Sequence, residues 1–199
     1  MTKAKIVVLV SGGGTNLQAI IDAEKKGIIK SGEISLVISG NPDAYALTRA
    51  KNSGIATKVI PSASKDFEDR LISTLEKEKI DLIVLAGFMK ILSEKFTSRF
   101  ANRIINVHPA LIPSFCGKGY YGLKVHEEAL KYGVKVTGAT VHFVNEIPDG
   151  GKIIAQKAVK VRLSDTPETL QKRVMQQAEW IILPRAVELV SKQIIKEKK

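Results

Sequence analysis

Short runs of apolar and β-branched residues recur along the first half of the chain, and most are separated by stretches whose apolar residues follow helical spacing. Such runs predict β-strands, here at residues 5–11, 33–39, 56–60, 81–85 and 104–108. The amphipathic stretches predict helices at residues 16–26, 44–52, 67–79 and 124–132. Because several strands are almost uninterruptedly apolar, both faces of the sheet should be covered. The alternation predicts an α/β fold, with a Rossmann-like, mostly parallel twisted sheet and helices on both faces.

The pattern changes after residue 133. Residues 136–144 and 152–161 are two further predicted strands, joined by a turn-rich segment at residues 145–151. This arrangement predicts a C-terminal antiparallel hairpin. A long amphipathic helix is expected from about Pro167, with an interruption near Pro184, because proline cannot donate a helix hydrogen bond.

Composition favours an ordinary globular protein. The chain has 199 residues, which suits one domain with a real core, and 44% of them are hydrophobic and 26% charged. No apolar run reaches membrane length, and residues 1–5 lead into the first strand without the pattern of a signal peptide. The single cysteine, Cys116, cannot form an internal disulfide. We therefore expect a cytoplasmic protein that does not bind membranes.

The charge balance narrows the expected partners. The net charge of +11, from 31 basic and 20 acidic residues, would attract phosphate groups. The lysines are spread along the sequence, with one dense cluster at residues 196–199, and there is no zinc-finger pattern or aromatic-interleaved basic stripe. We expect a small anionic substrate and no binding of nucleic acid.

A glycine-rich segment, Ser-Gly-Gly-Gly-Thr-Asn at residues 11–16, follows the first predicted strand and opens a predicted helix. Glycines let backbone N–H groups approach an anion, and a helix N-terminus adds partial positive charge. The alternative is a tight turn with Thr15 or Asn16 as the helix N-cap. A dinucleotide fingerprint would need glycine at Leu17 and an acidic residue near residues 39–41, and a P-loop would need Gly-Lys-Ser/Thr; all are missing.

The fifth predicted strand stops at a proline on Asn106 and His108. Two residues apart on a strand, these side chains point to the same side. An amide donor and an imidazole suit a reaction that builds negative charge on a carbonyl oxygen. The alternatives are a satisfied strand-end pair, with Asp149 an ordinary turn aspartate, His142 a core-lining residue and His126 part of a helix start. No His, Asp or Glu set has metal-ligand spacing, so no metal is expected.

Four segments carry a resemblance to a known family. They are residues 8–20, 85–92, 105–113 and 138–144, the last taken together with Asp149-Gly150-Gly151. With these motifs in this order, the chain resembles the phosphoribosylglycinamide formyltransferases, folate-dependent enzymes of purine synthesis, from end to end. The resemblance implies the formyltransferase fold and transfer of a formyl group from 10-formyltetrahydrofolate to the amine of glycinamide ribonucleotide.

The resemblance also implies roles for individual residues. Asn106, His108 and Asp149 would do the chemistry by stabilising and resolving a tetrahedral intermediate. Asp149 beside the His108 ring would favour a protonated imidazolium. The ribonucleotide would contact Gly13, Gly14, Thr15, Asn16 and, through an acidic side chain, Glu179. The folate would contact Met89, Lys90, Ile91, Leu92, Val144, Asn145, Glu146, Ile147 and Pro148. We expect one domain over residues 1–199, with a nucleotide-phosphate-binding half at 1–103 and a catalytic and folate-binding half at 104–199, acting as a monomer or homodimer.

The sequence departs from the family pattern at three places. The residues around Glu179 differ from the usual Gln-Glu-His, the loop at residues 114–122 is longer than in many members, and Ser64 or Lys65 stands where some relatives place a basic folate-tail contact. Two related enzymes are alternative functions. They are methionyl-tRNA formyltransferase, which carries a C-terminal nucleic-acid-binding domain, and formyltetrahydrofolate hydrolase, which carries an N-terminal regulatory domain. We expect neither, because the residues after the hairpin are too few for the first domain and the first predicted strand already begins at residue 5. A phosphate-binding module without turnover is the non-enzymatic alternative.

Overall fold

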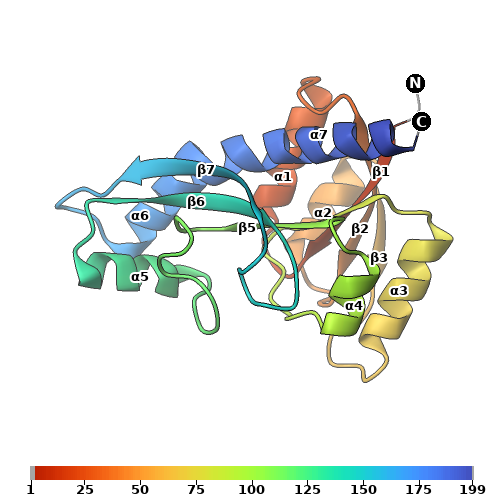
Figure 1. Cartoon of the computed structure of the whole chain (residues 1–199), viewed down its shortest axis with the longest axis horizontal. Coiled ribbons are helices and arrows are strands. Elements are labelled where there is room, and N and C mark those ends of the chain that lie inside the picture. Colours follow the sequence, from red (N-terminus) through yellow and green to blue (C-terminus); the bar gives the residue numbers. More distant parts are fainter. Residues whose placement is uncertain (1–2, 199) are drawn as a thin grey trace.

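The computed structural model describes residues 3–198 and contains one seven-stranded sheet with helices on both faces (Figure 1). The strand order is β3-β2-β1-β4-β5-β6-β7. Strands β1 to β5 are parallel, whereas β6 runs antiparallel to β5 and to β7. The strands are β1 Ala4–Val10, β2 Gly32–Ser39, β3 Ala56–Val59, β4 Leu82–Leu85, β5 Ile104–His108, β6 Val136–Phe143 and β7 Ile153–Lys160. The predicted fold, including the C-terminal hairpin, is confirmed.

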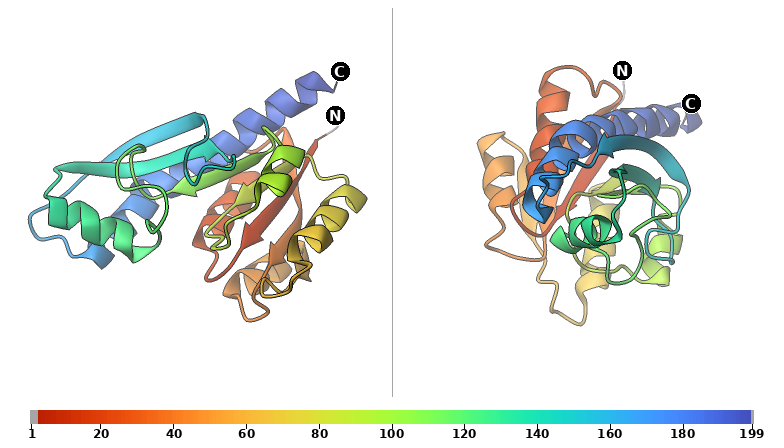
Figure 2. Two further views of the ribbon diagram at one scale, coloured as in Figure 1. Left: turned by 60° about the horizontal axis from the view of Figure 1, so that its bottom comes forward. Right: turned by 90° about the vertical axis from the view of Figure 1, so that its left-hand side faces the viewer.

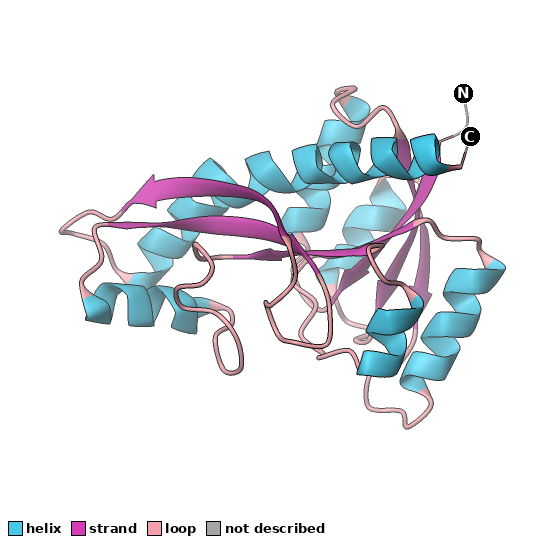
Figure 3. Ribbon diagram, in the orientation of Figure 1, coloured by secondary structure: helices cyan, strands magenta, loops and turns pink. Residues whose placement is uncertain are grey.

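The helices lie in two layers, as Figures 2 and 3 show. They are α1 Thr15–Lys25, α2 Tyr45–Asn52, α3 Phe67–Lys77, α4 Glu94–Arg99, α5 Leu123–Tyr132, α6 Pro167–Val174 and α7 Trp180–Glu197. Alternation along β1 divides the core, because neighbouring side chains point to opposite faces. Ile6 and Val8 pack in the core that includes residues of α1, α2 and α7, whereas Val7 and Leu9 pack in the core that includes residues of α3 and α4. Within residues 3–198, no helix is long and apolar enough to cross a membrane.

The predicted elements agree with the structure within two residues at their ends, with two exceptions. Helix α4 was not predicted, because its six residues are too few to show an amphipathic period; Ser93 caps it by accepting a hydrogen bond from the Phe96 N–H. The expected interruption near Pro184 is wrong. Pro184 lies inside α7, and the irregular turn comes earlier, as a π-helical segment at Met175–Glu179. The helix thus accommodates the lost hydrogen bond without a break, and the wider turn falls just before α7.

The strand order locates the crevice of the sheet. After β1 the chain moves outward through β2 and β3, and it then returns to place β4 on the other side of β1. In open α/β sheets, ligands bind beyond the carboxyl ends of the strands where the order reverses. Here that point lies between the glycine loop after β1 and residues 86–92 after β4. The two loops touch, because the Met89 N–H donates to the Ser11 hydroxyl at 3.0 Å.

Candidate active site

Asn106 and His142 lie opposite each other on β5 and β6. Directly opposed side chains on an antiparallel pair share one face of the sheet. The Asn106 Nδ2 atom is 3.3 Å from His142 Nε2, and His142 Nδ1 is 2.8 Å from the Phe143 carbonyl oxygen. The Phe143 carbonyl can only accept a hydrogen bond, so Nδ1 of His142 carries a proton, and Nε2 is the ring atom that meets the Asn106 amide. The strand pairing therefore orients the Asn106 amide through His142.

Asp149 reaches the same place from the β6–β7 loop. Its carboxylate is 3.4 Å from His108 Nδ1 and 3.5 Å from His142 Nε2, and it accepts a 2.9 Å hydrogen bond from the Gly117 N–H. The side chain is only 14% exposed. Asp149 is therefore held between two imidazoles, and the alternative of a solvated turn aspartate does not describe its surroundings.

The orientation of His108 is set by a backbone group. Its Nε2 atom is 2.8 Å from the Phe115 carbonyl oxygen, which can only accept a hydrogen bond. Nε2 therefore carries a proton, and Nδ1 faces the Asp149 carboxylate. Of the two ring nitrogens, Nδ1 is the one placed to gain and lose a proton.

A pocket of about 130 Å³ opens beside Asn106, His142 and Asp149. It brings together eight of the nine residues predicted to contact folate: Lys90, Ile91, Leu92, Val144, Asn145, Glu146, Ile147 and Pro148. Met89 is not part of its lining and is 57% exposed. The lining also includes Leu85 and Phe88, which were not predicted.

The glycine loop is fixed by its carbonyl groups. The Gly12 carbonyl accepts from the Ala46 N–H at 3.0 Å, and the Gly13 carbonyl accepts from Arg49 Nε at 2.8 Å. Gly14 has a φ of 73°, and a Cβ added there would lie 2.6 Å from the Ala46 Cβ. Among residues 3–198, the N–H groups of Gly13 and Gly14 have no acceptor. The loop therefore presents donors at a helix N-terminus, an arrangement suited to an anion.

Asn16 and Glu179 form a buried pair, although they are far apart in the sequence. Asn16 Nδ2 donates to Glu179 Oε2 at 2.7 Å, and the Asn16 Oδ1 atom is buried without a partner among the described residues. Helix α1 has Gly14 as its N-cap and no side-chain cap, so the alternative in which Thr15 or Asn16 caps the helix is wrong. The π-helical turn brings the Glu179 carboxylate to the first turn of α1.

A model of the formyl transferase family matches residues 4–187. The chain belongs to the formyl transferase family. The phosphoribosylglycinamide formyltransferase of Haemophilus influenzae is 44% identical over 187 residues, which cover 92% of this chain and 85% of that protein. A chloroplastic phosphoribosylglycinamide formyltransferase of Arabidopsis thaliana is 40% identical over 178 residues, covering 87% of this chain. The crystal structure of glycinamide ribonucleotide transformylase 1 from Symbiobacterium toebii matches with a TM-score of 0.88 at 40% identity, covering 96% of this chain and 89% of that chain. The chain spans 61% of the Arabidopsis protein and as little as 14% of other relatives.

The surroundings of Asp149 and His108 favour different protonation states in the two side chains. Burial alone would raise the pKa of Asp149, but His142, His108 and the Gly117 N–H together hold that pKa below its usual value. Burial lowers the pKa of His108, and the Asp149 carboxylate and the Phe115 carbonyl only partly oppose it. At neutral pH the carboxylate is therefore ionised and the His108 ring neutral. The sequence had suggested an imidazolium favoured by Asp149, and burial is the opposing effect that the sequence did not reveal.

The structure also locates the other two histidines, His142 and His126. His142 contacts Asn106 and Asp149, so the expectation that it only lines the core is wrong. The sequence signal for His142 was the alternation that places polar Thr140 and His142 on one face of β6. The sequence did not reveal the register of β6 against β5, which decides what His142 contacts. His126 lies in α5 as expected, fully buried, and burial lowers its pKa to about 4.

Proposed function

We propose that this chain transfers a formyl group from 10-formyltetrahydrofolate to the primary amine of glycinamide ribonucleotide, as a step of purine biosynthesis. Membership of the formyl transferase family and the names of the relatives support the reaction class. The observation that carries the proposal is the position of Asp149 between His108 and His142, beside Asn106 and at the edge of a pocket. No metal takes part in the proposed reaction.

The donor fits the pocket beside Asn106 only in part. Pockets for whole drug-sized ligands measure roughly 300–1,000 Å³, and this one measures about 130 Å³. We assign the pterin ring to the pocket and the remainder of the folate to the surface at Met89 and Ile91, whose side chains are 57% and 67% exposed. The Lys90 ammonium lies 4.3 Å from the centre of the Phe67 ring and donates to the Ser62 carbonyl, on the side where a folate tail would leave.

The acceptor is assigned to the glycine loop. Its phosphate would take hydrogen bonds from the N–H groups of Gly13, Gly14 and Thr15, with the dipole of α1 adding positive potential. Asn16 and Glu179 would contact the rest of the ribonucleotide. In this arrangement each ligand draws on both halves of the chain, because Glu179 joins the loop after β1 and residues 90–92 join the pocket beside Asp149.

The chemistry follows from the three side chains. The amine nitrogen attacks the formyl carbon, a carbon–nitrogen bond forms, and the carbonyl electron pair becomes an oxyanion. An N–H of the Asn106 amide would stabilise that oxygen. Asp149 would accept the proton released by the amine, directly or through water, and pass it to His108 Nδ1, which is unprotonated in the resting site, so that the charged ring also stabilises the oxygen. The proton would then pass to the folate nitrogen as its bond to the formyl carbon breaks. Tetrahydrofolate and the formylated ribonucleotide leave.

The test is an absorbance assay for release of tetrahydrofolate from 10-formyltetrahydrofolate, with and without glycinamide ribonucleotide. We expect turnover only when the amine is present. Turnover without it would identify a hydrolase, and binding of the ribonucleotide without turnover would identify a phosphate-binding module. Either result would reject the proposal.

A further inference from the structure

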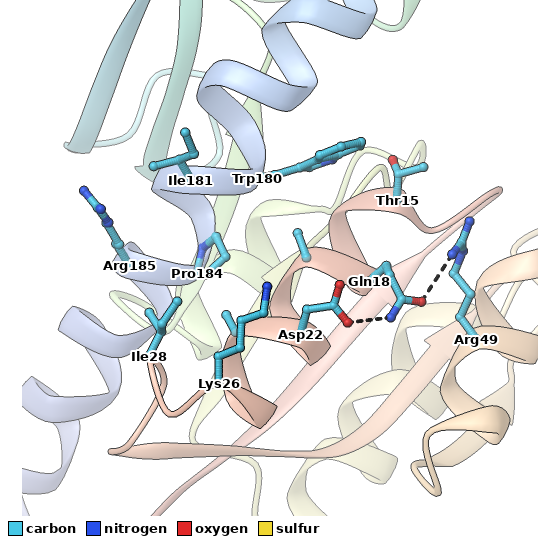
Figure 4. A pocket seen from close by; sticks show the side chains of 12 residues that line it. Thr15, Gln18, Asp22, Lys26, Ile28, Arg49, Trp180, Ile181, Pro184 and Arg185 are labelled. Atoms are coloured by element: carbon cyan, nitrogen blue, oxygen red, sulfur yellow. Dashed lines mark hydrogen bonds between the residues drawn. The ribbon is translucent and has the colours of Figure 1, made fainter.

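A second cavity, of about 450 Å³, lies between α1, α2 and the first turns of α7 (Figure 4). Its volume falls within the roughly 300–1,000 Å³ of small-molecule sites. None of the residues that line the pocket beside Asn106 also lines this cavity. It meets the glycine-loop region only at Thr15. Neither the catalytic side chains nor the predicted folate residues therefore account for it.

The walls of this cavity are mostly apolar. Helix α7 contributes Trp180, Ile181 and Pro184, and α1 faces them with Ala19 and Ala23. Figure 4 shows these two helices on opposite sides of the space. The indole N–H of Trp180 is buried and has no acceptor among the described residues. Such walls favour a flat apolar group, since burying it removes apolar surface from water.

The charged side chains of the cavity are mainly basic. Lys26, Arg49 and Arg185 line it, against the single carboxylate of Asp22. Asp22 accepts a 2.9 Å hydrogen bond from the Gln18 amide. Among residues 3–198, the Lys26 ammonium and the Arg185 guanidinium have neither a hydrogen-bond acceptor nor an ion-pair partner. In Figure 4 the Lys26 ammonium extends into the space between α1 and α7. Two cations thus remain available to an anion.

We propose that this cavity binds a small anion that carries a flat aromatic ring, of the class of a nucleoside monophosphate. The ring lies against Trp180 and Pro184, and the anionic group lies beside the Lys26 ammonium, with Arg185 adding positive charge at the rim. The site is occupied together with the ribonucleotide site, and its occupancy weakens the binding of the ribonucleotide.

Arg49 supplies the physical link between the two sites. It lines the cavity, and its guanidinium also donates to the Gly13 carbonyl at 2.8 Å and to the Gln18 amide oxygen at 3.2 Å. An anion in the cavity attracts this guanidinium and competes with the Gly13 carbonyl, which loosens the glycine loop. It also adds negative charge near the place assigned to the ribonucleotide phosphate. Both effects raise the KM for the ribonucleotide, and coupling between the sites is reciprocal for binding.

The test uses Trp180, the only tryptophan of the chain, as a fluorescent reporter in the cavity wall. Adenosine 5′-monophosphate is titrated into the full chain, alone and with saturating glycinamide ribonucleotide. Adenosine and inorganic phosphate are the controls that lack the anion or the ring. We expect a saturable change with the monophosphate that persists when the ribonucleotide is present, and weaker or no responses to the two controls.

The variant Lys26→Glu/Arg185→Glu should raise the Kd of the monophosphate at least about tenfold, a loss that corresponds to about 1.4 kcal/mol. Lys124→Glu/Lys131→Glu, which reverses two charges at exposed sites on α5, is the matched control and should bind as wild type. A missing fluorescence change, a change abolished by the ribonucleotide, or an unchanged Kd in the double variant would overturn the proposed site. These measurements do not depend on the proposed function. The coupling is tested by measuring the KM for the ribonucleotide with and without adenosine 5′-monophosphate, and this measurement does rest on the proposed function. An unchanged KM in an active enzyme would overturn the coupling.

Discussion

Replacing Asp149 by Asn removes the carboxylate that faces both His108 and His142, and it keeps the shape of the side chain. The amide cannot accept the proton released by the attacking amine, and it cannot stabilise a charged His108. We therefore expect kcat to fall by roughly 10²–10⁴, the usual contribution of a positioned acid or base. Binding of both substrates should change little, because the proposed contacts to them lie elsewhere.

The magnitude of the electrostatic change follows from the distance. His108 Nδ1 and the Asp149 oxygen are 3.4 Å apart, and the two side chains are 5% and 14% exposed. Two unit charges at that separation attract each other by roughly 5 kcal/mol at an effective dielectric constant of about 20. This figure is an upper bound, since the loop relaxes and water enters when the charge is removed. Burial already lowers the pKa of His108, and Asp149→Asn removes the carboxylate that opposes this effect, so we expect the pKa of His108 to fall further.

Two measurements check this reasoning. Proton NMR can follow the His108 ring directly, because the chain has only three histidines. The rate of tetrahydrofolate release gives kcat for Asp149→Asn, His108→Ala and the double variant, with folding checked by circular dichroism. The double variant should lose much less than the product of the single losses, because the residues share one step. Asp69→Asn, which breaks an exposed ion pair between α3 and Lys95 of α4, is the control and should resemble wild type. Near wild-type activity in Asp149→Asn, or fully multiplicative losses, would refute the shared role.

Three further predictions concern the ligand sites. Gly14→Val should raise the ribonucleotide KM and leave folate binding largely intact, because Gly14 has a φ of 73° and a close neighbour. The control Gly13→Ala places its new Cβ in open space and should fold normally. An unchanged KM in folded Gly14→Val would remove the loop from the site. Burial raises the pKa of Glu179 to about 6, so the wild-type protein loses stability as pH rises from 4.5 through 6. Glu179→Gln should therefore unfold with a free energy about 2 kcal/mol higher than wild type at neutral pH and with a similar free energy below pH 4.5. Equal urea denaturation curves at neutral pH would contradict this. Lys90→Glu and Ile91→Ala should weaken a folate analogue more than the ribonucleotide in calorimetric titrations, and equal losses would contradict the assignment.

The sequence alone determined the elements that depend on neighbouring residues. Apolar runs and helical spacing located the strands and most helices within two residues. The glycines after β1 and the spacing of Asn106 and His108 on β5 also identified their places in the fold, because these features are local. Helix α4 and the π-helical turn before α7 were missed or misplaced, since a short helix shows no period and proline suggests a break that packing can absorb.

Only the tertiary structure decided which distant side chains meet. The register of β5 and β6 placed His142 opposite Asn106, and the loop after β6 returned Asp149 to His108. Asn16 and Glu179, 163 residues apart, became partners through the π-helical turn. Burial then lowered the pKa of His108 against the pull of its carboxylate, because desolvation depends on everything packed around the ring. Sequence patterns report on neighbours along the chain, whereas contacts, register and burial are properties of the whole packed fold.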